Sequence, residues 1–190
     1  PLDTFYDIKH RHRASYASAT IIYVLLIIVS ILAVYLTSFV FARNDVTSFN
    51  FLRYTAIIVS GILLFVFSNY LISTLNNGEG WFKDVYISTA YALMPYVLLT
   101  LPIVVLSNIM TQNEIFIYQA MLFIRNGWSI LLIVIMIKEI HGYSVSELIK
   151  NILLTVFTMV MIALILFLIY VLLNQMIDYF VGIIKEVLLR

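Results

Sequence analysis

Long apolar stretches follow one another along almost the whole chain. In chain order they cover residues 14–42, 54–78, 85–113, 115–137 and 151–177. Four of them contain no charged residue, and the fourth in this order, 115–137, contains only Arg125. A helix needs about 20 apolar residues to cross a hydrocarbon core about 30 Å thick. The pattern therefore predicts an all-α integral membrane protein, a bundle of five transmembrane helices with bounds near 14–42, 54–76, 85–107, 115–137 and 150–173.

The fourth predicted span carries a charge, Arg125, near its centre. A central arginine costs about 2.5–3.5 kcal/mol on the insertion scale, whereas each Leu, Ile, Val or Phe favours insertion by about 0.3–0.6 kcal/mol. Thirteen of these apolar residues lie in 115–137, so their sum outweighs the charge. We predict five crossings, and four crossings is the alternative.

Short amphipathic segments flank the transmembrane domain, residues 14–177. Residues 1–13 mix apolar and charged positions, which is typical of a helix in the lipid headgroup layer; an arm that binds a partner is the alternative. In the last segment, Asn174, Asp178 and Lys185 share one helical face and apolar residues line another. Residues 178–190 are therefore predicted to continue the last span as an amphipathic extension, lying on the membrane surface or on a partner.

Composition narrows the classes of function. Hydrophobic residues make up 63% of the chain and charged residues 11%, against about 25% charged residues in soluble domains. A net charge of +1 without a large basic cluster argues against nucleic acid binding. The chain has no cysteine, and its three histidines, His10, His12 and His141, have no metal-site spacing. Because no acid–base or nucleophile pair is evident either, we expect no enzyme activity, metal or cofactor.

The distribution of basic residues predicts the orientation in the membrane. Lysine and arginine are enriched in cytoplasmic loops near the ends of spans, and the densest group, Lys9, Arg11 and Arg13, precedes the first span. We therefore expect a protein of the cell membrane with a cytoplasmic N-terminus. An odd number of crossings then places the C-terminus outside.

The loop between the second and third spans is the richest polar stretch of the chain. It is either a tight turn anchored at the interface or a surface that contacts another protein, for which Glu79 could pair with a cation of another subunit; a homo-oligomer is possible. Under the predicted orientation this loop and the loop between the fourth and fifth spans are both cytoplasmic. Together they supply the candidate partner-contact residues Gly78, Glu79, Gly80, Lys83, Asp84, Lys138, His141 and Lys150.

Three residues inside the spans are unusual for membrane helices. Pro95 and Pro102 interrupt the third span, which should be kinked or locally unwound because proline lacks an N–H and clashes with the preceding turn. Arg125 is an ionisable group within a span and hence a functional candidate. Its potential partners are Asn69, Asn126, carbonyls near Pro95 or an acid of another protein; otherwise its side chain reaches the headgroups.

Several of these segments resemble one known family. The resemblance is carried by Asn-Gly-Glu-Gly-Trp-Phe-Lys-Asp-Val-Tyr at 77–86, Tyr-Ala-Leu-Met-Pro-Tyr at 91–96, the opening at 1–9, His-Gly-Tyr-Ser at 141–144 and the ending at 185–190. In order and over nearly the full length, these segments resemble the bacterial branch of the Yip (Ypt-interacting protein) domain family. The resemblance implies five spans, a cytoplasmic N-terminus and no enzyme activity.

Bacterial members of that family resemble accessory membrane proteins, often encoded beside carbohydrate ABC importers. The resemblance thus implies a non-enzymatic accessory or scaffold subunit in contact with lipids and other integral membrane proteins, in particular the permease of such an importer. A small oligomeric transporter or channel built around the proline-kinked third span is the alternative. Its weakness is the lack of acidic residues inside the spans, which ion coupling would require.

Overall fold

The fold is entirely helical in the computed structural model, which describes residues 2–11, 14–42 and 49–188. Its elements are α1 (Leu2–Arg11), α2 (Tyr16–Leu36), α3 (Phe51–Leu75), α4 (Phe82–Ala92), α5 (Met94–Ser107), the short 3₁₀ helix η2 (Gln112–Glu114), α6 (Ile115–His141) and α7 (Val145–Leu188). Within the described residues, five helical segments are long and apolar enough to span a membrane: α2, α3, α4 with α5, η2 with α6, and α7. The protein is thus an all-α membrane protein built on five membrane-spanning segments, as the apolar stretches predict.

Polar residues at the ends of the spans fix where the helices begin and end. Ser15 caps α2 by accepting from Ser18 N, and Asn50 caps α3 by accepting from Arg53 N. The side chain of Glu147 accepts hydrogen bonds from both the backbone N–H and the hydroxyl of Ser144 at the start of α7. Gly142 ends α6 in a left-handed conformation with φ 68°, which glycine adopts without steric cost. These caps satisfy backbone groups that have no partner inside their own helix.

The third span is two helices rather than one. It is interrupted at Leu93, where α4 ends and α5 begins, two residues before Pro95. Pro95 lies in the first turn of α5, where backbone N–H groups have no acceptor inside the helix, so the missing N–H of proline costs no hydrogen bond. The residue before a proline disfavours helical geometry. Pro102 lies within α5, and the helix continues through it to Ser107.

The core of the bundle lies at the end where α1 is found. There α2 and α6 pack on α4, and the fully buried Ala19, Ala90 and Ala92 keep the packed elements thin. Small residues allow membrane helices to approach closely, which favours van der Waals packing in place of a hydrophobic driving force. Val85, Met136 and Ile140, also fully buried, fill the space between them.

Helix α1 packs on protein through the side that the sequence assigned to lipid headgroups. Phe5 and Ile8 are 2% and 4% exposed and belong to the same core, in contact with α4 and α6. Two large apolar side chains gain more from a preformed protein cleft than from the mixed polar headgroup layer. The N-terminal segment is therefore part of the bundle; Arg11 is its last helical residue, and Arg13 lies outside the described residues.

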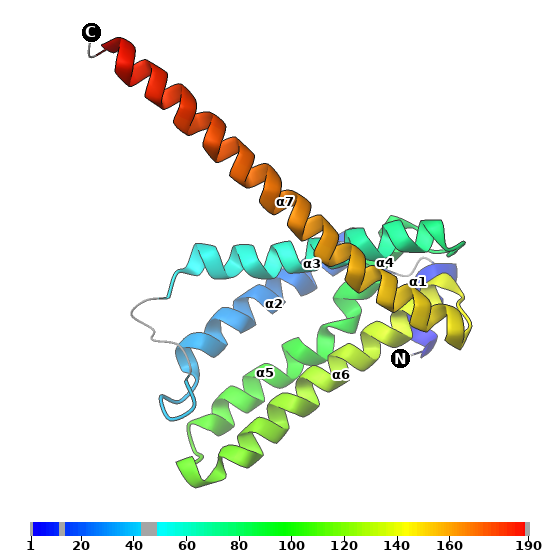
Figure 1. The fold of residues 1–190 in the computed structure, drawn as a ribbon. Helices are drawn as coiled ribbons and strands as arrows, with labels where there is room; N and C mark the ends of the chain where they lie inside the picture. The colour runs from blue at the N-terminus through cyan, green and yellow to red at the C-terminus, as the bar shows by residue number, and fades with distance from the viewer. Residues whose placement is uncertain (1, 12–13, 43–48, 189–190) are drawn as a thin grey trace.

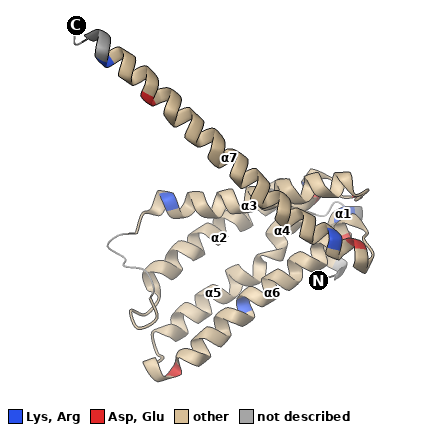
Figure 2. Ribbon diagram, in the orientation of Figure 1, with Lys and Arg blue, Asp and Glu red and all other residues tan. Residues whose placement is uncertain are grey.

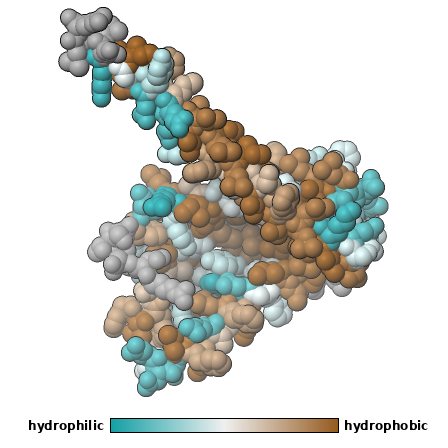
Figure 3. Space-filling view, viewed as in Figure 1, coloured by the Kyte–Doolittle hydropathy of each residue, from teal (hydrophilic) through white to brown (hydrophobic). Residues whose placement is uncertain are grey.

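Helix α7 leaves the bundle and projects away from it, as Figure 1 shows. It has 44 residues, which corresponds to about 66 Å at 1.5 Å per residue. Its first turns pack on α3 and α6, but only 6% of its most apolar window is buried, against 22–39% for the other four spans. The projecting part is largely apolar on the face shown in Figure 3 and becomes more polar toward its end.

The packing of α1 on the bundle can be tested by shortening the buried side chain of Phe5. Phe5→Ala removes a side chain that is 2% exposed, and loss of a buried phenylalanine costs about 3–5 kcal/mol. We expect the segment to undock, so that trypsin cleaves after Lys9 much faster than in the unmodified protein. Thr4→Ala, at the neighbouring exposed position, is the control. Equal cleavage of both variants would show that α1 is not held by this contact.

Candidate functional site

Two sites combine polar groups with the bundle interior, and they lie toward opposite ends of it. The first is the junction where residues 76–81, the loop after α3, meet the end of α6. Gly78 N donates to Ser73 O at 2.8 Å, and Glu79 N donates to His141 O at 3.5 Å. Asn77 adopts a positive φ of 54°, which turns the loop back over the end of α6.

Both glycines of this loop are needed for the close approach. A Cβ at Gly78 would lie 2.6 Å from Tyr143 Oη and 3.0 Å from His141 Nδ1. One at Gly80 would lie 2.5 Å from Ile140 Cγ2 and 2.8 Å from His141 Nδ1. The glycines that frame Glu79 therefore serve packing inside this chain, because any side chain there would lift the loop off α6.

A buried polar network lies directly beneath residues 76–81, called the glycine loop below, and joins α3, α6 and α7. Asn69 Nδ2 donates to Asn151 Oδ1 at 3.1 Å and to Thr155 Oγ1 at 3.3 Å. Because this amide nitrogen donates, Asn69 Oδ1 accepts from His141 Nε2, 3.1 Å away. All four side chains are 0–2% exposed. Asn69 thus holds one residue of α6 and two of α7.

The network continues to the loop between α6 and α7. Asn151 Nδ2 donates to Tyr143 Oη at 3.2 Å, and that phenol donates to Ser73 O at 3.4 Å. Burial raises the pKa of Tyr143, so the phenol keeps the proton that it donates. The proton of His141 lies on Nε2, which leaves Nδ1 buried against the two glycines with no hydrogen-bond partner among the described residues.

The residues predicted to contact a partner all lie at this end of the bundle, but not all face outward. Gly80, Asp84 and His141 are buried; Asp84 accepts from Trp81 N at 3.2 Å and so caps α4. Packing and capping within the chain already use these three residues, and their role as contact residues stays a prediction. Gly78 is half-buried, whereas the exposed members are Glu79, Lys83, Lys138 and Lys150.

Two lysines at this end have partners within the chain. Lys9 Nζ lies 2.5 Å from Glu79 Oε2, which ties α1 to the glycine loop and gives Glu79 a cation within its own chain. Lys83 Nζ lies 5.7 Å from the centroid of the Tyr16 ring. Figure 2 shows charged residues gathered near α1 and the start of α7. Such a polar rim fits the membrane–water interface.

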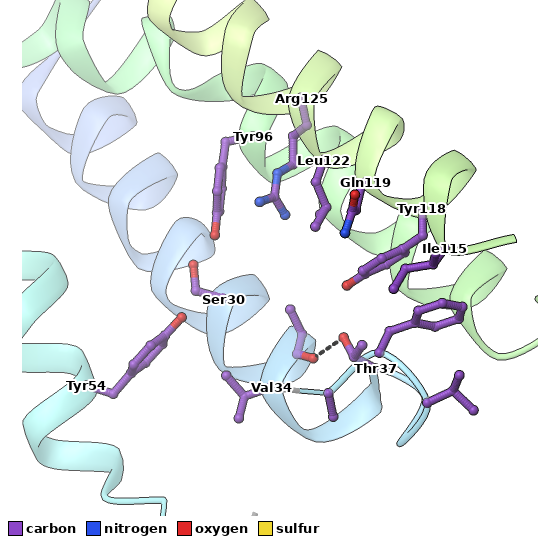
Figure 4. Close-up of a pocket in the computed structure, with 14 residues that line it drawn as sticks. Ser30, Val34, Thr37, Tyr54, Tyr96, Ile115, Tyr118, Gln119, Leu122 and Arg125 are labelled. Carbon is purple, nitrogen blue, oxygen red and sulfur yellow. Dashed lines mark hydrogen bonds between the residues drawn. The ribbon is translucent and has the colours of Figure 1, made fainter. Parts of the chain in front are cut away.

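The second site is a cavity of about 460 Å³ between α2, α3, α5 and α6. Its polar centre is Arg125, which donates through Nε and Nη2 to Asn126 Oδ1 and through Nη1 to Thr100 Oγ1, each at 3.1 Å. The guanidinium carbon also lies 4.3 Å from the centroid of the Tyr96 ring. Figure 4 shows the side chains of Arg125 and Tyr96 side by side in the cavity. Of the neutral partners considered from the sequence, Arg125 therefore uses Asn126, while Asn69 belongs to the buried network.

Sequence reasoning named several residues of both sites but missed the contacts that join them. The signals were present: Asn69 is an amide within an apolar stretch and Asn151 begins another, and polar side chains within membrane helices tend to face the protein interior. Spacing along the chain did not link them, because their partners come from three helices. The described residues contain no group of three or more His, Cys, Asp or Glu side chains placed to hold a metal ion.

The fold and these sites define a five-span helical membrane protein with a closed polar junction at one end. The Yip1 domain sequence model matches residues 1–168, so the chain belongs to the Yip1 domain family. The match ends within α7, about halfway along that helix. Neither a curated protein nor a solved structure shows significant similarity to the chain.

The close packing of the glycine loop predicts an unequal response to added methyl groups. Gly80→Ala should lower the free energy of unfolding by about 1–3 kcal/mol, the usual cost of overpacking. Gly61→Ala and Gly127→Ala are matched controls, since an added Cβ there meets nothing within 4 Å; within helices they should be neutral or stabilise by up to about 1 kcal/mol. Thermal unfolding in detergent measures the difference. Three equal melting temperatures would contradict the packing.

The polar network predicts that substituting Asn69 lowers the stability of the protein, whereas substituting its buried neighbour Ser68 does not. Asn69→Leu keeps most of the volume but leaves His141, Asn151 and Thr155 short of partners, which should cost about 1–2 kcal/mol. Ser68→Ala is the control, because the Ser68 hydroxyl is buried with no hydrogen-bond partner among the described residues. It should leave stability unchanged or raise it. Unfolding in mixed detergent micelles compares the two, and a stable Asn69→Leu protein would remove the network's structural role.

Proposed function

We propose that this protein is a non-enzymatic accessory or scaffold subunit that binds other integral membrane proteins through α7. The observation that carries the proposal is the apolar surface of this helix, which the chain itself leaves almost entirely uncovered. A helix of about 66 Å that projects from its bundle can lie against a neighbouring protein along much of its length.

Side chains along α7 support protein contact beyond contact with lipid. Phe157, Phe167 and Tyr170 are all more than 60% exposed, and large rigid aromatic groups contribute strongly to interfaces. Asn174 and Gln175 follow the most apolar part and are exposed as well. Amides on membrane helices stabilise helix association by hydrogen bonding across the contact. This favours docking on a partner over the alternative in which the extension lies on the membrane surface.

The proposed partner is the permease of a bacterial carbohydrate ABC importer. Resemblance to the bacterial branch of the Yip family supports this partner by analogy alone, since a shared fold does not establish function. With a cytoplasmic N-terminus, the exposed Lys83, Lys138 and Lys150 would add a basic surface on the cytoplasmic side. The importer's acidic surface residues would be its complement.

Photo-crosslinking in native membranes tests the proposal. A photoreactive amino acid at Phe167, on α7, should give one discrete protein adduct whose mass spectrum identifies a transporter permease. The same amino acid at Phe123, on α6, is the matched control, since Phe123 is 78% exposed but lies on the bundle; we expect lipid adducts there. Only lipid adducts at both positions, or adducts to a second copy of this chain, would overturn the partner assignment.

Transport is the second candidate function, favoured by the polar cavity beside the interrupted third span. Tyr96 and Thr100 of α5 lie within two turns of the break at Leu93 and contact Arg125. Flux of sugars, ions or lipids into liposomes that contain only this protein would support transport. A reconstituted protein without flux leaves the scaffold role.

A further inference from the structure

We propose that the cavity beside Arg125 is a binding site for a phosphate group, carried either by an anionic lipid headgroup or by a small soluble phosphate. The two sources share one chemistry, a phosphate oxyanion held by arginine and hydroxyl donors. This inference is independent of the role proposed for α7.

The first observation is a charge inside the bundle that has no opposite charge among the described residues around it. Arg125 lies ten residues after the start of α6, about 15 Å along the helix. None of the described residues that line the cavity is acidic, and its hydrogen-bond partners there are the neutral Asn126 and Thr100. Arg125 is half-buried in a membrane-spanning segment, where a charged side chain is costly unless it pairs with another group, so an incoming anion would complete the site.

The second observation is the number of donors still available. A guanidinium has five N–H groups, and three of them are used in the hydrogen bonds to Asn126 and Thr100. The two that remain suit an oxyanion, because arginine forms strong charge-assisted bonds with phosphate and carboxylate oxygens. The Tyr96 ring keeps the guanidinium in place from one side.

The third observation is an unpaired hydroxyl that points into the same cavity. Ser30 is 2% exposed, and its Oγ has no hydrogen-bond partner among the described residues. Figure 4 shows this hydroxyl directed toward Tyr96, with the Tyr54 hydroxyl and the Gln119 amide also turned inward. A buried donor without a partner costs about 1–3 kcal/mol, and a bound oxygen atom would remove that cost.

The set of donors favours phosphate over carboxylate. Donors from α2, α3, α5 and α6 surround one space, and a tetrahedral group with three or four oxygens can accept from several directions at once. Val34 and Leu122 supply apolar wall beside these donors, which suits the glycerol and upper chain of a lipid. The lining continues to residues 40–42, in the segment that follows α2, and to Ile115, the first residue of α6, so the cavity reaches from mid-span to the rim of the bundle.

The test uses the full chain in phosphatidylcholine nanodiscs. In one arm, phosphatidic acid is added as a minor component and the lipid retained by the protein is identified by native mass spectrometry. In the other arm, inorganic phosphate is titrated and the melting temperature is followed. Retention of phosphatidic acid over phosphatidylcholine identifies a lipid headgroup as the source. Stabilisation by inorganic phosphate identifies a soluble phosphate.

Four variants separate the site from general charge effects. Arg125→Gln should weaken binding at least about tenfold, the value of one charge-assisted hydrogen bond, and Arg125→Lys should fall between because lysine lacks the planar fork. Ser30→Ala should weaken binding about fivefold while the melting temperature without ligand stays the same or rises. Arg53→Gln removes an exposed charge at the start of α3 and should bind as the unmodified protein does.

Three results would overturn the proposal. One is that neither phosphatidic acid nor inorganic phosphate binds. Another is that Arg53→Gln loses as much affinity as Arg125→Gln, which would indicate attraction to total charge only. The third, which applies even if Arg125→Gln fails to fold, is that Arg125→Lys and Ser30→Ala both bind with unchanged affinity.

Discussion

Polar groups inside a hydrocarbon layer must find hydrogen-bond partners within the protein, and the fold depends on how this chain meets that requirement at Asn69. One amide side chain bonds His141 of α6 and both Asn151 and Thr155 of α7. Water cannot substitute for these partners within the membrane, so the three helices are held in one relative position. The glycine loop can then lie flat over their ends, and α1 can dock through Lys9 and Glu79.

The two ends of the bundle differ in how completely they are packed. At the end with α1, glycine and alanine let backbones approach closely, and Lys9 is paired with Glu79 within the chain. Toward the other end the helices enclose a cavity that contains the cation of Arg125, and none of the described residues that line this cavity is acidic. Tight packing transmits strain and tolerates little added volume, whereas an unfilled polar cavity has room for a ligand. The close packing lies at one end, and the room for a small ligand at the other.

Helix α7 connects the packed end with the surroundings of the protein. Its first turns belong to the polar network, while its later turns have almost no contact with the rest of the chain. A partner bound to the projecting part would therefore act on the same rigid helix that Asn69 holds. This arrangement suits a subunit whose bundle is an anchor and whose last helix is the contact.

The sequence by itself determined the fold class and the five spans, because the length and hydrophobicity of an apolar stretch are local properties and they alone decide whether a helix can cross the hydrocarbon core. It also located the break in the third span near Pro95, since a proline acts on its own turn and on the residue before it. The arrangement of side chains across helices was decided only by the tertiary structure. Spacing along the chain does not reveal the linkage of Asn69 to residues more than seventy positions away. It also does not reveal the burial of Asp84 and His141 or the meeting of Ser30 with Arg125 in one cavity. Helix rotation and the order of packing set those contacts.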